Sequence, residues 1–140
     1  MLRFQLVSVS GMKFDDDVYE VLVPTKDGVI AIFEDHMPLI SAGVPGVISI
    51  RQQQSDKDDD MRHFAVNGGI LDIDGKTLRF LSEEVTAPED VSEKQAEEAL
   101  ARAQALISGA GSRAALEEAH HMLRHSTAQL HIARLKRRKH

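Results

Sequence analysis

The 140-residue sequence contains no cysteine and no tryptophan, and aromatic residues make up only 4% of it. The lack of cysteine excludes disulfide scaffolds, thiolate metal sites and cysteine nucleophiles, and it suits a reducing compartment. The shortage of aromatic side chains argues against the stacking surfaces that bind nucleic-acid bases. A hydrophobic content of 42% still supports a core. We therefore expect one medium domain, or one small domain with an appendage.

Long hydrophobic runs are also absent. No run of about 18 apolar residues occurs, which is the length that a membrane-spanning helix requires. The N-terminal segment MLRFQLVSVS alternates like a strand, without the apolar core of a signal peptide and without a transit peptide before it. We expect a cytosolic protein, and the pattern leaves open a place on a membrane complex.

Acidic and basic residues are unevenly distributed, although the formal net charge is only −5. Acidic residues cluster at positions 15–17 and 56–60, whereas none follows Glu118. A basic end on an acidic chain predicts a protein partner with an acidic surface, and binding to nucleic-acid phosphates is the alternative. The basic residues of this end are Arg124, Arg134, Lys136, Arg137, Arg138 and Lys139.

The sequence pattern changes near Pro88. Before it, short apolar runs alternate with a period of two, and turn signals separate them at positions 26–28, 67–69 and 74–75. Closely spaced short strands predict a β-sandwich or barrel. The Asp74-Gly75 pair predicts a hairpin turn of the primed type. The polar segment 52–60 predicts an exposed hairpin loop, because it lacks the glycine and distal glutamate of a calcium loop.

After Pro88 the pattern is helical. Asp90 or Ser92 is placed to cap a first helix, which a glycine-rich turn at 109–111 ends, and Ser112 is placed to cap a second. The second helix carries a seven-residue repeat of leucine and small residues. These residues are Leu116, Leu123 and Leu130, with Ala119, Ser126 and Ala133 between them.

The predicted fold is an N-terminal β-sandwich docking domain over residues 1–87, followed by a C-terminal antiparallel two-helix hairpin over residues 88–140 that forms a regulatory domain. The small residues of the helices bury little apolar area, so a two-helix hairpin alone is marginally stable. Two alternatives remain open at this point. The hairpin either packs permanently on the sandwich, or it undocks and extends.

Recognisable catalytic motifs are missing. The sequence has no phosphate-binding loop of the GxxxxGK type and no GxSxG elbow. Glu117, His121 and His125 share one helix face at a spacing that zinc ligands use, but no further ligand is evident, so we expect a solvated outer face. His36 has no nucleophile or orienting carboxylate placed beside it by a motif. We therefore expect a protein that is not an enzyme and holds no metal.

The most informative segment covers residues 28–46, GVIAIFEDHMPLISAGVPG. A strand-like run leads into an apolar loop, after which the segment 44–46 enters another strand. Turns normally carry small polar residues, so an apolar loop tip indicates that a partner covers it. The tip consists of His36, Met37, Pro38, Leu39 and Ile40.

Two motifs, GVIAIFEDHMPLISAGVPGVISI and FAVNGGILDIDGKTLRFLSEEV, are followed by an Ala/Glu-rich helix and a basic helix. This order resembles the epsilon subunit of bacterial F-type rotary ATP synthases over nearly the whole chain. The resemblance implies a non-catalytic subunit of the central stalk that couples proton-driven rotation of the c-ring to ATP synthesis. It places the sandwich against the gamma subunit and the c-ring, with the tip at residues 36–40 near the polar loops of that ring.

The resemblance further implies a hairpin with a folded-down and an extended state. The extended hairpin blocks rotation and inhibits ATP hydrolysis, and its basic face meets an acidic segment of the beta subunit. The matching residues here are Arg124, Arg134, Lys136, Arg137 and Arg138.

Some family members bind ATP through an Ile/Leu-Asp-x-x-Arg-Ala motif at the start of the first helix. Here Ser92 replaces the acidic residue and Gln95 replaces the arginine, while Val91, Ala96 and Arg102 occupy the other matching positions. Two charge-assisted contacts are thereby lost, so we expect weak or absent ATP binding and no cofactor. The alternatives to a stalk subunit are a nucleotide-sensing regulatory module and a basic-tailed nucleic-acid-binding domain.

Overall fold

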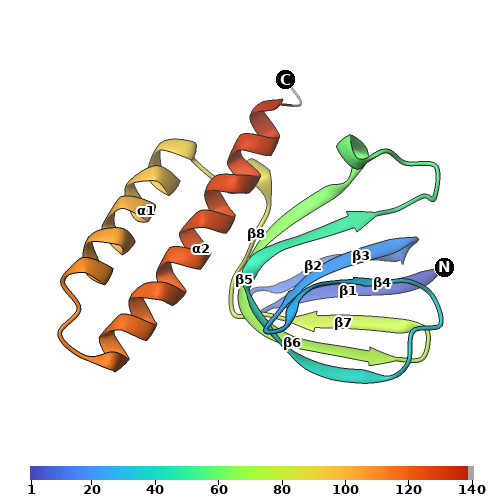
Figure 1. Cartoon of the computed structure of the whole chain (residues 1–140). Coiled ribbons are helices and arrows are strands. Elements are labelled where there is room, and N and C mark those ends of the chain that lie inside the picture. Colours follow the sequence, from blue (N-terminus) through green and yellow to red (C-terminus); the bar gives the residue numbers. More distant parts are fainter. Residues whose placement is uncertain (139–140) are drawn as a thin grey trace.

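The computed structural model describes the backbone of residues 1–138 and the side chains through Leu135. Figure 1 shows a group of strands on one side and two antiparallel helices on the other. The elements, in chain order, are β1 (Leu2–Ser8), β2 (Gly11–Val18), β3 (Glu20–Thr25), β4 (Gly28–Ile32), β5 (Leu39–Arg51), η1 (Asp58–Asp60), β6 (Arg62–Asp74), β7 (Thr77–Leu81), β8 (Val85–Thr86), η2 (Pro88–Asp90), α1 (Glu93–Ser108) and α2 (Arg113–Arg138). The predicted order of a β domain followed by a two-helix hairpin is confirmed.

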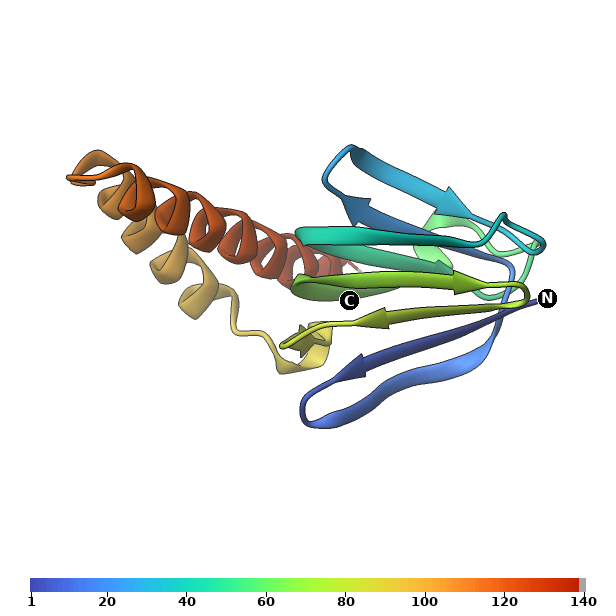
Figure 2. The ribbon, with the colours of Figure 1, turned by 90° about the horizontal axis from the view of Figure 1, so that it is seen from below.

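The strands pair in the order β2-β1-β7-β6-β5-β3-β4, and β8 pairs with β6. The β1–β7 pair is parallel, and the other pairs are antiparallel. The view in Figure 2 shows the strands curving around a common interior. Every second residue of β1 is buried, as a strand with one face on a core requires. The largest side chains of this core are Phe4, Leu6, Ile48, Leu71 and Phe80.

The two long strands β5 and β6 run without a break through positions where the sequence predicted a turn or the start of a strand. The predicted turn at 67–69 lies inside β6, and the predicted entry at 44–46 lies inside β5. Both predictions were wrong, because glycines in and beside these segments make room for packing inside continuous strands. Gly43 and Gly69 are cross-strand partners, and a Cβ on Gly43 would lie 2.5 Å from Cζ of Phe80. The glycine pair thus lets the Phe80 ring lie against the backbone.

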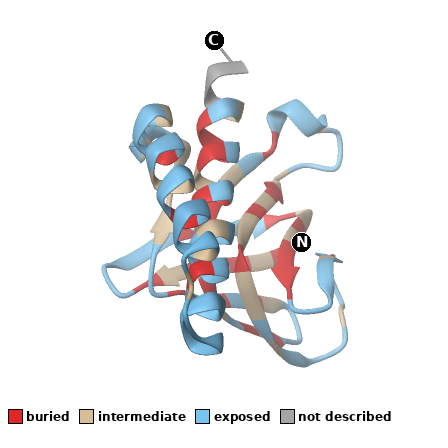
Figure 3. Ribbon diagram, turned by 60° about the vertical axis from the view of Figure 1, so that its left-hand side comes forward, coloured by how far each residue is buried: buried red, intermediate tan, exposed pale blue. Residues whose placement is uncertain are grey.

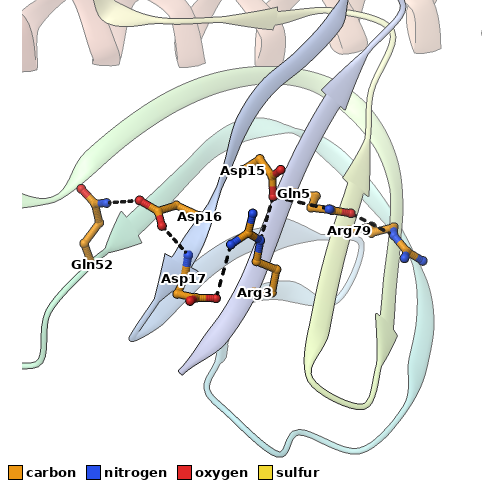
Figure 4. A network of polar contacts seen from close by, with 7 residues as sticks. All are labelled: Arg3, Gln5, Asp15, Asp16, Asp17, Gln52 and Arg79. Atoms are coloured by element: carbon orange, nitrogen blue, oxygen red, sulfur yellow. Dashed lines mark hydrogen bonds and ion pairs between the residues drawn. The ribbon is translucent and has the colours of Figure 1, made fainter.

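A strand that the sequence analysis missed, β2, carries the acidic run at 15–17 along an edge of the sheet. The alternating run from Val18 to Val23 is divided between β2 and β3. Aspartate is a poor strand former, and tertiary contacts compensate here. As Figure 4 shows, Arg3 Nε donates to Asp15 Oδ1 (2.9 Å), and Gln52 Nε2 donates to Asp16 Oδ2 (3.3 Å).

The Arg3–Asp15 ion pair lies on the surface and changes the pKa of its carboxyl group. The hydrogen bond from Arg3 lowers the pKa of Asp15 below its usual value. A carboxyl group with a lowered pKa contributes stability above its unfolded pKa and loses that contribution as the pH falls through its folded pKa. Because the pair is exposed to solvent, we expect its contribution to be small and to weaken further with salt.

Two predicted connections have the expected form. Asp74 and Thr77 are paired across the β6–β7 turn, and Gly75 adopts a φ of +60°, as a primed hairpin turn requires. The segment 52–60 joins β5 to β6 as an exposed loop. Arg51 holds this loop, because its guanidinium contacts Glu20 (3.1 Å) and Asp58 (2.5 Å).

The helix caps distinguish between the two predicted start points of α1. Ser92 is the N-cap, and its Oγ accepts a hydrogen bond from the Gln95 backbone N–H (3.3 Å), whereas Asp90 lies in η2. Ser112 caps α2 as predicted, since its Oγ accepts from the Ala115 backbone N–H (3.1 Å). The hairpin turn at 109–111 lies between the two helices.

Helix α2 packs against both α1 and the sheet, and Figure 1 shows it lying between them. The predicted small-residue stripe is buried at Ala119, Ser126 and Ala133, as close packing of two helices requires. A second face, which the sequence analysis did not identify, contacts the sheet through Ala128 and Ile132. These two residues pack with Ala65, Val47 and Val91 in a cluster separate from the sandwich core. The buried positions appear as red segments in Figure 3.

Candidate functional site

The apolar loop predicted at residues 36–40 lies at the end of the sandwich far from the helices, as Figures 1 and 2 both show. It follows β4, and Leu39 and Ile40 form the first residues of β5. The amino group of Met1 contacts Glu34 Oε1 (3.1 Å), which places the N-terminus beside this loop. The loop therefore projects from a rigid β framework, away from the hairpin.

The tip is exposed despite its apolar character. Met37 is 78% exposed and Ile40 is 76% exposed, whereas Leu39 is 36% exposed. Its shape is fixed locally, because Nδ1 of His36 donates to the Met37 carbonyl oxygen (2.8 Å) and Asp35 adopts a φ of +62°. One ring nitrogen of His36 is therefore engaged in a hydrogen bond that shapes the loop. Two exposed apolar side chains on an ordered tip form a surface that a partner would cover.

An apolar band, which the sequence analysis missed, continues from the tip across the outer face of the sheet. Ile40 and Ala42 are outward residues of β5, and Ala42 pairs with Ile70 of β6. Ile70 in turn pairs with Leu81 of β7, and these two side chains are 53% and 46% exposed. The alternation of residues 70–73 contained this signal, but the sequence alone did not show which strands are neighbours. We define the apolar band as Ala42, Ile70 and Leu81, which begins next to Ile40 of the tip.

The predicted basic contact residues lie on α2. Arg124 is exposed. Arg134 is 53% exposed and reaches α1, where its guanidinium lies 3.8 Å from Glu93 Oε1 and 3.9 Å from Glu97 Oε1. In this conformation Arg134 joins the two helices. The side chains of Lys136, Arg137 and Arg138 lie outside the described residues.

The five positions of the degenerate nucleotide motif come together at one cavity of about 450 Å³ between the helices and the sandwich. Such a volume lies in the range of small-molecule sites. The charges are poorly suited to a triphosphate, because Asp90 and Glu98 share the lining with a single arginine. The motif positions in the lining are Val91, Ser92, Gln95, Ala96 and Arg102.

The helix face of Glu117, His121 and His125 is not uniformly solvated, and that prediction was wrong for one residue. Glu117 lies 3.6 Å from Arg113, and His121 is exposed. The side chain of His125 is only 17% exposed, and its Nε2 lies 3.5 Å from Glu84 Oε2. The second face of α2 explains the difference, because it turns His125 toward the sandwich.

Comparison with known proteins defines the class. The profile of the ATP synthase delta/epsilon chain β-sandwich domain matches residues 1–88. The ATP synthase epsilon chain of Neisseria meningitidis serogroup C, serotype 2a, is 30% identical over 130 residues, which cover 93% of this chain and 91% of that protein. The epsilon chain of a Sulfurihydrogenibium species is 35% identical over 92 residues, 66% of each chain.

A solved structure shares the fold. A chain from the cryo-EM structure of the Euglena gracilis mitochondrial ATP synthase OSCP/F1/c-ring aligns with a TM-score of 0.76. The alignment covers 99% of this chain and 81% of that one, at 14% sequence identity. The chain thus has the sandwich-plus-hairpin architecture, and it belongs to the family of ATP synthase epsilon chains. This membership confirms the prediction of a non-catalytic ATP synthase subunit. No helix among residues 1–138 is long and apolar enough to cross a membrane.

Proposed function

We propose that the chain is a rotor subunit of the central stalk of a proton-translocating ATP synthase, where it couples c-ring rotation to ATP synthesis. Family membership supports this role, and the observation that carries it is the ordered, exposed apolar tip with Met37 and Ile40. Torque transfer requires a stiff connection, and this tip projects from paired strands on both sides. The chain then acts as a mechanical part and leaves the chemistry to other subunits.

The two apolar surfaces suit two different partners in this assembly. The tip at residues 36–40 would contact the c-ring, and the apolar band would contact the gamma subunit. Side chains such as Ile70 and Leu81 are half-exposed here, and a partner that covered them would gain hydrophobic free energy. In this arrangement the chain is peripheral to the bacterial cell membrane on its cytoplasmic side.

Two negative charges placed on the tip should uncouple proton pumping from ATP hydrolysis. We expect the double variant Met37→Asp/Ile40→Asp to weaken c-ring binding by at least about tenfold, because central apolar contacts dominate interface energies. ATP-driven proton pumping by the reconstituted synthase should fall relative to its ATP hydrolysis. Val29→Asp is the matched control, since Val29 is 67% exposed on β4 outside the tip. Equal pumping by the double variant, the control and the wild type would contradict the proposed contact.

The hairpin is proposed to inhibit ATP hydrolysis through contact of its basic helix with the beta subunit. In the structure Arg134 is held by Glu93 and Glu97 of α1, so it would have to exchange these partners for acidic residues of beta. Exposed ion pairs are weak, and the hairpin touches the sheet through a small apolar cluster. Two states that differ by a few kcal/mol are the expected consequence.

ATP binding at the hairpin cavity is proposed to be weak or absent. We expect calorimetry to give a dissociation constant weaker than about 100 μM, because each lost charge-assisted bond is worth about 1.5–3 kcal/mol. The double variant Ser92→Asp/Gln95→Arg should tighten binding at least about tenfold, and aspartate also serves as an N-cap. Gln104→Arg, on an exposed position of α1, controls for added charge. A low-micromolar constant for the wild type would favour the nucleotide-sensing alternative.

A further inference from the structure

The contact between His125 and Glu84 is a polar bridge from a side chain of α2 to the sandwich. Its two atoms, His125 Nε2 and Glu84 Oε2, lie 3.5 Å apart. His125 precedes Ala128 and Ile132, which pack on Ala65 of β6, so the bridge borders the apolar cluster. The contact therefore lies at the surface that must separate if the hairpin leaves the sheet.

Glu84 is held in place by the strand beside it. Its backbone carbonyl oxygen accepts a hydrogen bond from the Asn67 backbone N–H (3.3 Å). The single Ser82 hydroxyl proton is shared between the Gly68 carbonyl oxygen (2.6 Å), the shorter contact, and the Glu84 carbonyl oxygen (3.1 Å). These bonds fix the segment between β7 and β8 on β6. The carboxylate is thus presented to α2 from a rigid support, although 53% of it remains exposed.

Two buried polar atoms, one on α2 and one on β6, have no hydrogen-bond partner among the described residues. They are Nδ1 of His125 and Oδ1 of Asn67. Asn67 lies two residues after Ala65 on β6, and His125 lies three residues before Ala128 on α2, so both belong to the interface between helix and sheet. A carboxylate and an amide oxygen are both acceptors. A neutral imidazole has one N–H to offer, whereas a protonated imidazole has two.

We propose that His125 and Glu84 form a proton-dependent latch that holds the hairpin on the sandwich. Protonated His125 pairs with the Glu84 carboxylate and carries a second N–H donor on its buried Nδ1, which has no partner among the described residues. Neutral His125 loses the ion pair with Glu84. Docking is therefore strengthened as the pH falls through the range in which histidine titrates, and weakened as the pH rises. The latch belongs to the chain itself and does not depend on the proposed stalk function.

Other charged groups border α2 and must be separated from the effect. Three groups of residues are involved. On the sheet they are Arg51 of β5 and Arg62, His63, Asp72 and Asp74 of β6; on η2 and α1 they are Glu89, Asp90, Glu93, Lys94, Glu97, Glu98 and Arg102. On α2 itself, His120, His121, Arg124 and His131 lie within two turns of His125. Carboxylates and guanidinium groups with ordinary pKa values do not titrate between about pH 5.5 and 8. Histidine is the residue class whose charge ordinarily changes in this range, so variants at His63 and His121 are the necessary controls.

The test uses the full chain, whose lack of cysteine allows two dyes to be attached at introduced positions. The dyes are attached at Val9→Cys and Gly111→Cys, and single-molecule energy transfer between them reports docking. Val9 lies in an exposed turn of the sandwich, and Gly111 lies in the hairpin turn, where a Cβ would meet no atom within 4 Å. We expect the ratio of docked to undocked molecules to rise about threefold to tenfold between about pH 8 and pH 5.5. Where undocked molecules are too rare to count, an Ile132→Ala background weakens the apolar cluster equally at every pH.

The variants determine whether the latch is responsible. Glu84→Gln and His125→Gln should each abolish the pH dependence. His121→Gln, one turn away and exposed, and His63→Gln on β6 should retain it. An unchanged ratio in the wild type at both pH values would overturn the proposal. So would a pH dependence that survives in Glu84→Gln or His125→Gln, or one that favours undocking in acid.

Discussion

Replacing Gly69 with alanine is expected to destabilise the sandwich by about 3 kcal/mol or more, which is an exceptional effect for one methyl group. The new Cβ would lie 2.2 Å from the carbonyl oxygen of Leu81 and 2.8 Å from the Phe80 ring. The φ of Gly69 is also +151°, a value that residues with a side chain rarely adopt. Neither the β7 backbone nor the buried ring can move away without breaking the sheet, so the cost falls on the whole domain.

Urea unfolding of the full chain measures this effect, and Gly11→Ala is its matched control. Gly11 also has a positive φ, +123°, but a Cβ there would meet no atom within 4 Å. The control carries the backbone strain alone, which we expect to cost about 1–2 kcal/mol. The difference between the two variants isolates the steric term. Equal losses of stability would show that close packing at Gly69 is not what requires glycine.

The second large effect is expected at Ile132, where aspartate should release the hairpin and leave the sandwich folded. Ile132 is fully buried, and it packs against Ala65 and Val91 outside the sandwich core. Burial of an unpaired carboxylate costs several kcal/mol, so undocking is the easier response. Hydrogen exchange at the α2 amides should accelerate by at least about a hundredfold, because docking contributes their protection. The amides of β5 and β6 should exchange as in the wild type.

Leu116→Asp provides the control for this prediction, because Leu116 is on the same helix but is already 36% exposed. In the assembled enzyme, Ile132→Asp should lower ATP hydrolysis if release of the hairpin permits the inhibitory state. Deletion of the residues after Ser108 should raise it. Hydrolysis that is unchanged by the deletion would remove the proposed inhibitory role, and protected α2 amides in Ile132→Asp would contradict the docking argument.

The elements that the sequence predicted correctly are those with strong local signals. The caps at Ser92 and Ser112 are local hydrogen bonds, and the turn at Gly75 needs a positive φ at that residue alone. The exposed apolar tip was also visible, because an apolar loop contradicts the usual composition of turns. The errors occurred where long-range contacts decide the outcome. Gly68 and Gly69 resemble a turn until the neighbouring strands are known.

Parts of the candidate sites depended on strand and helix neighbours in the same way. The apolar band joins Ala42, Ile70 and Leu81, which are far apart in sequence and meet through the pairing of three strands. The position of His125 was misjudged because the repeat of leucines revealed one buried face of α2 and concealed the other. Periodicity reports that a face is buried, but it does not report how many partners a helix has.

The sequence by itself determined the order of a β domain and a helical hairpin, the exposed tip at Met37, and the loss of the nucleotide motif at Ser92 and Gln95. These features follow from hydrophobic period, capping and residue identity, which act over a few positions. Only the tertiary structure decided that Gly69 admits Phe80, that Ile132 anchors the hairpin, and that His125 faces Glu84. Each of these depends on atoms from distant segments, and the chain brings such segments together only when the sheet and hairpin close around their cores.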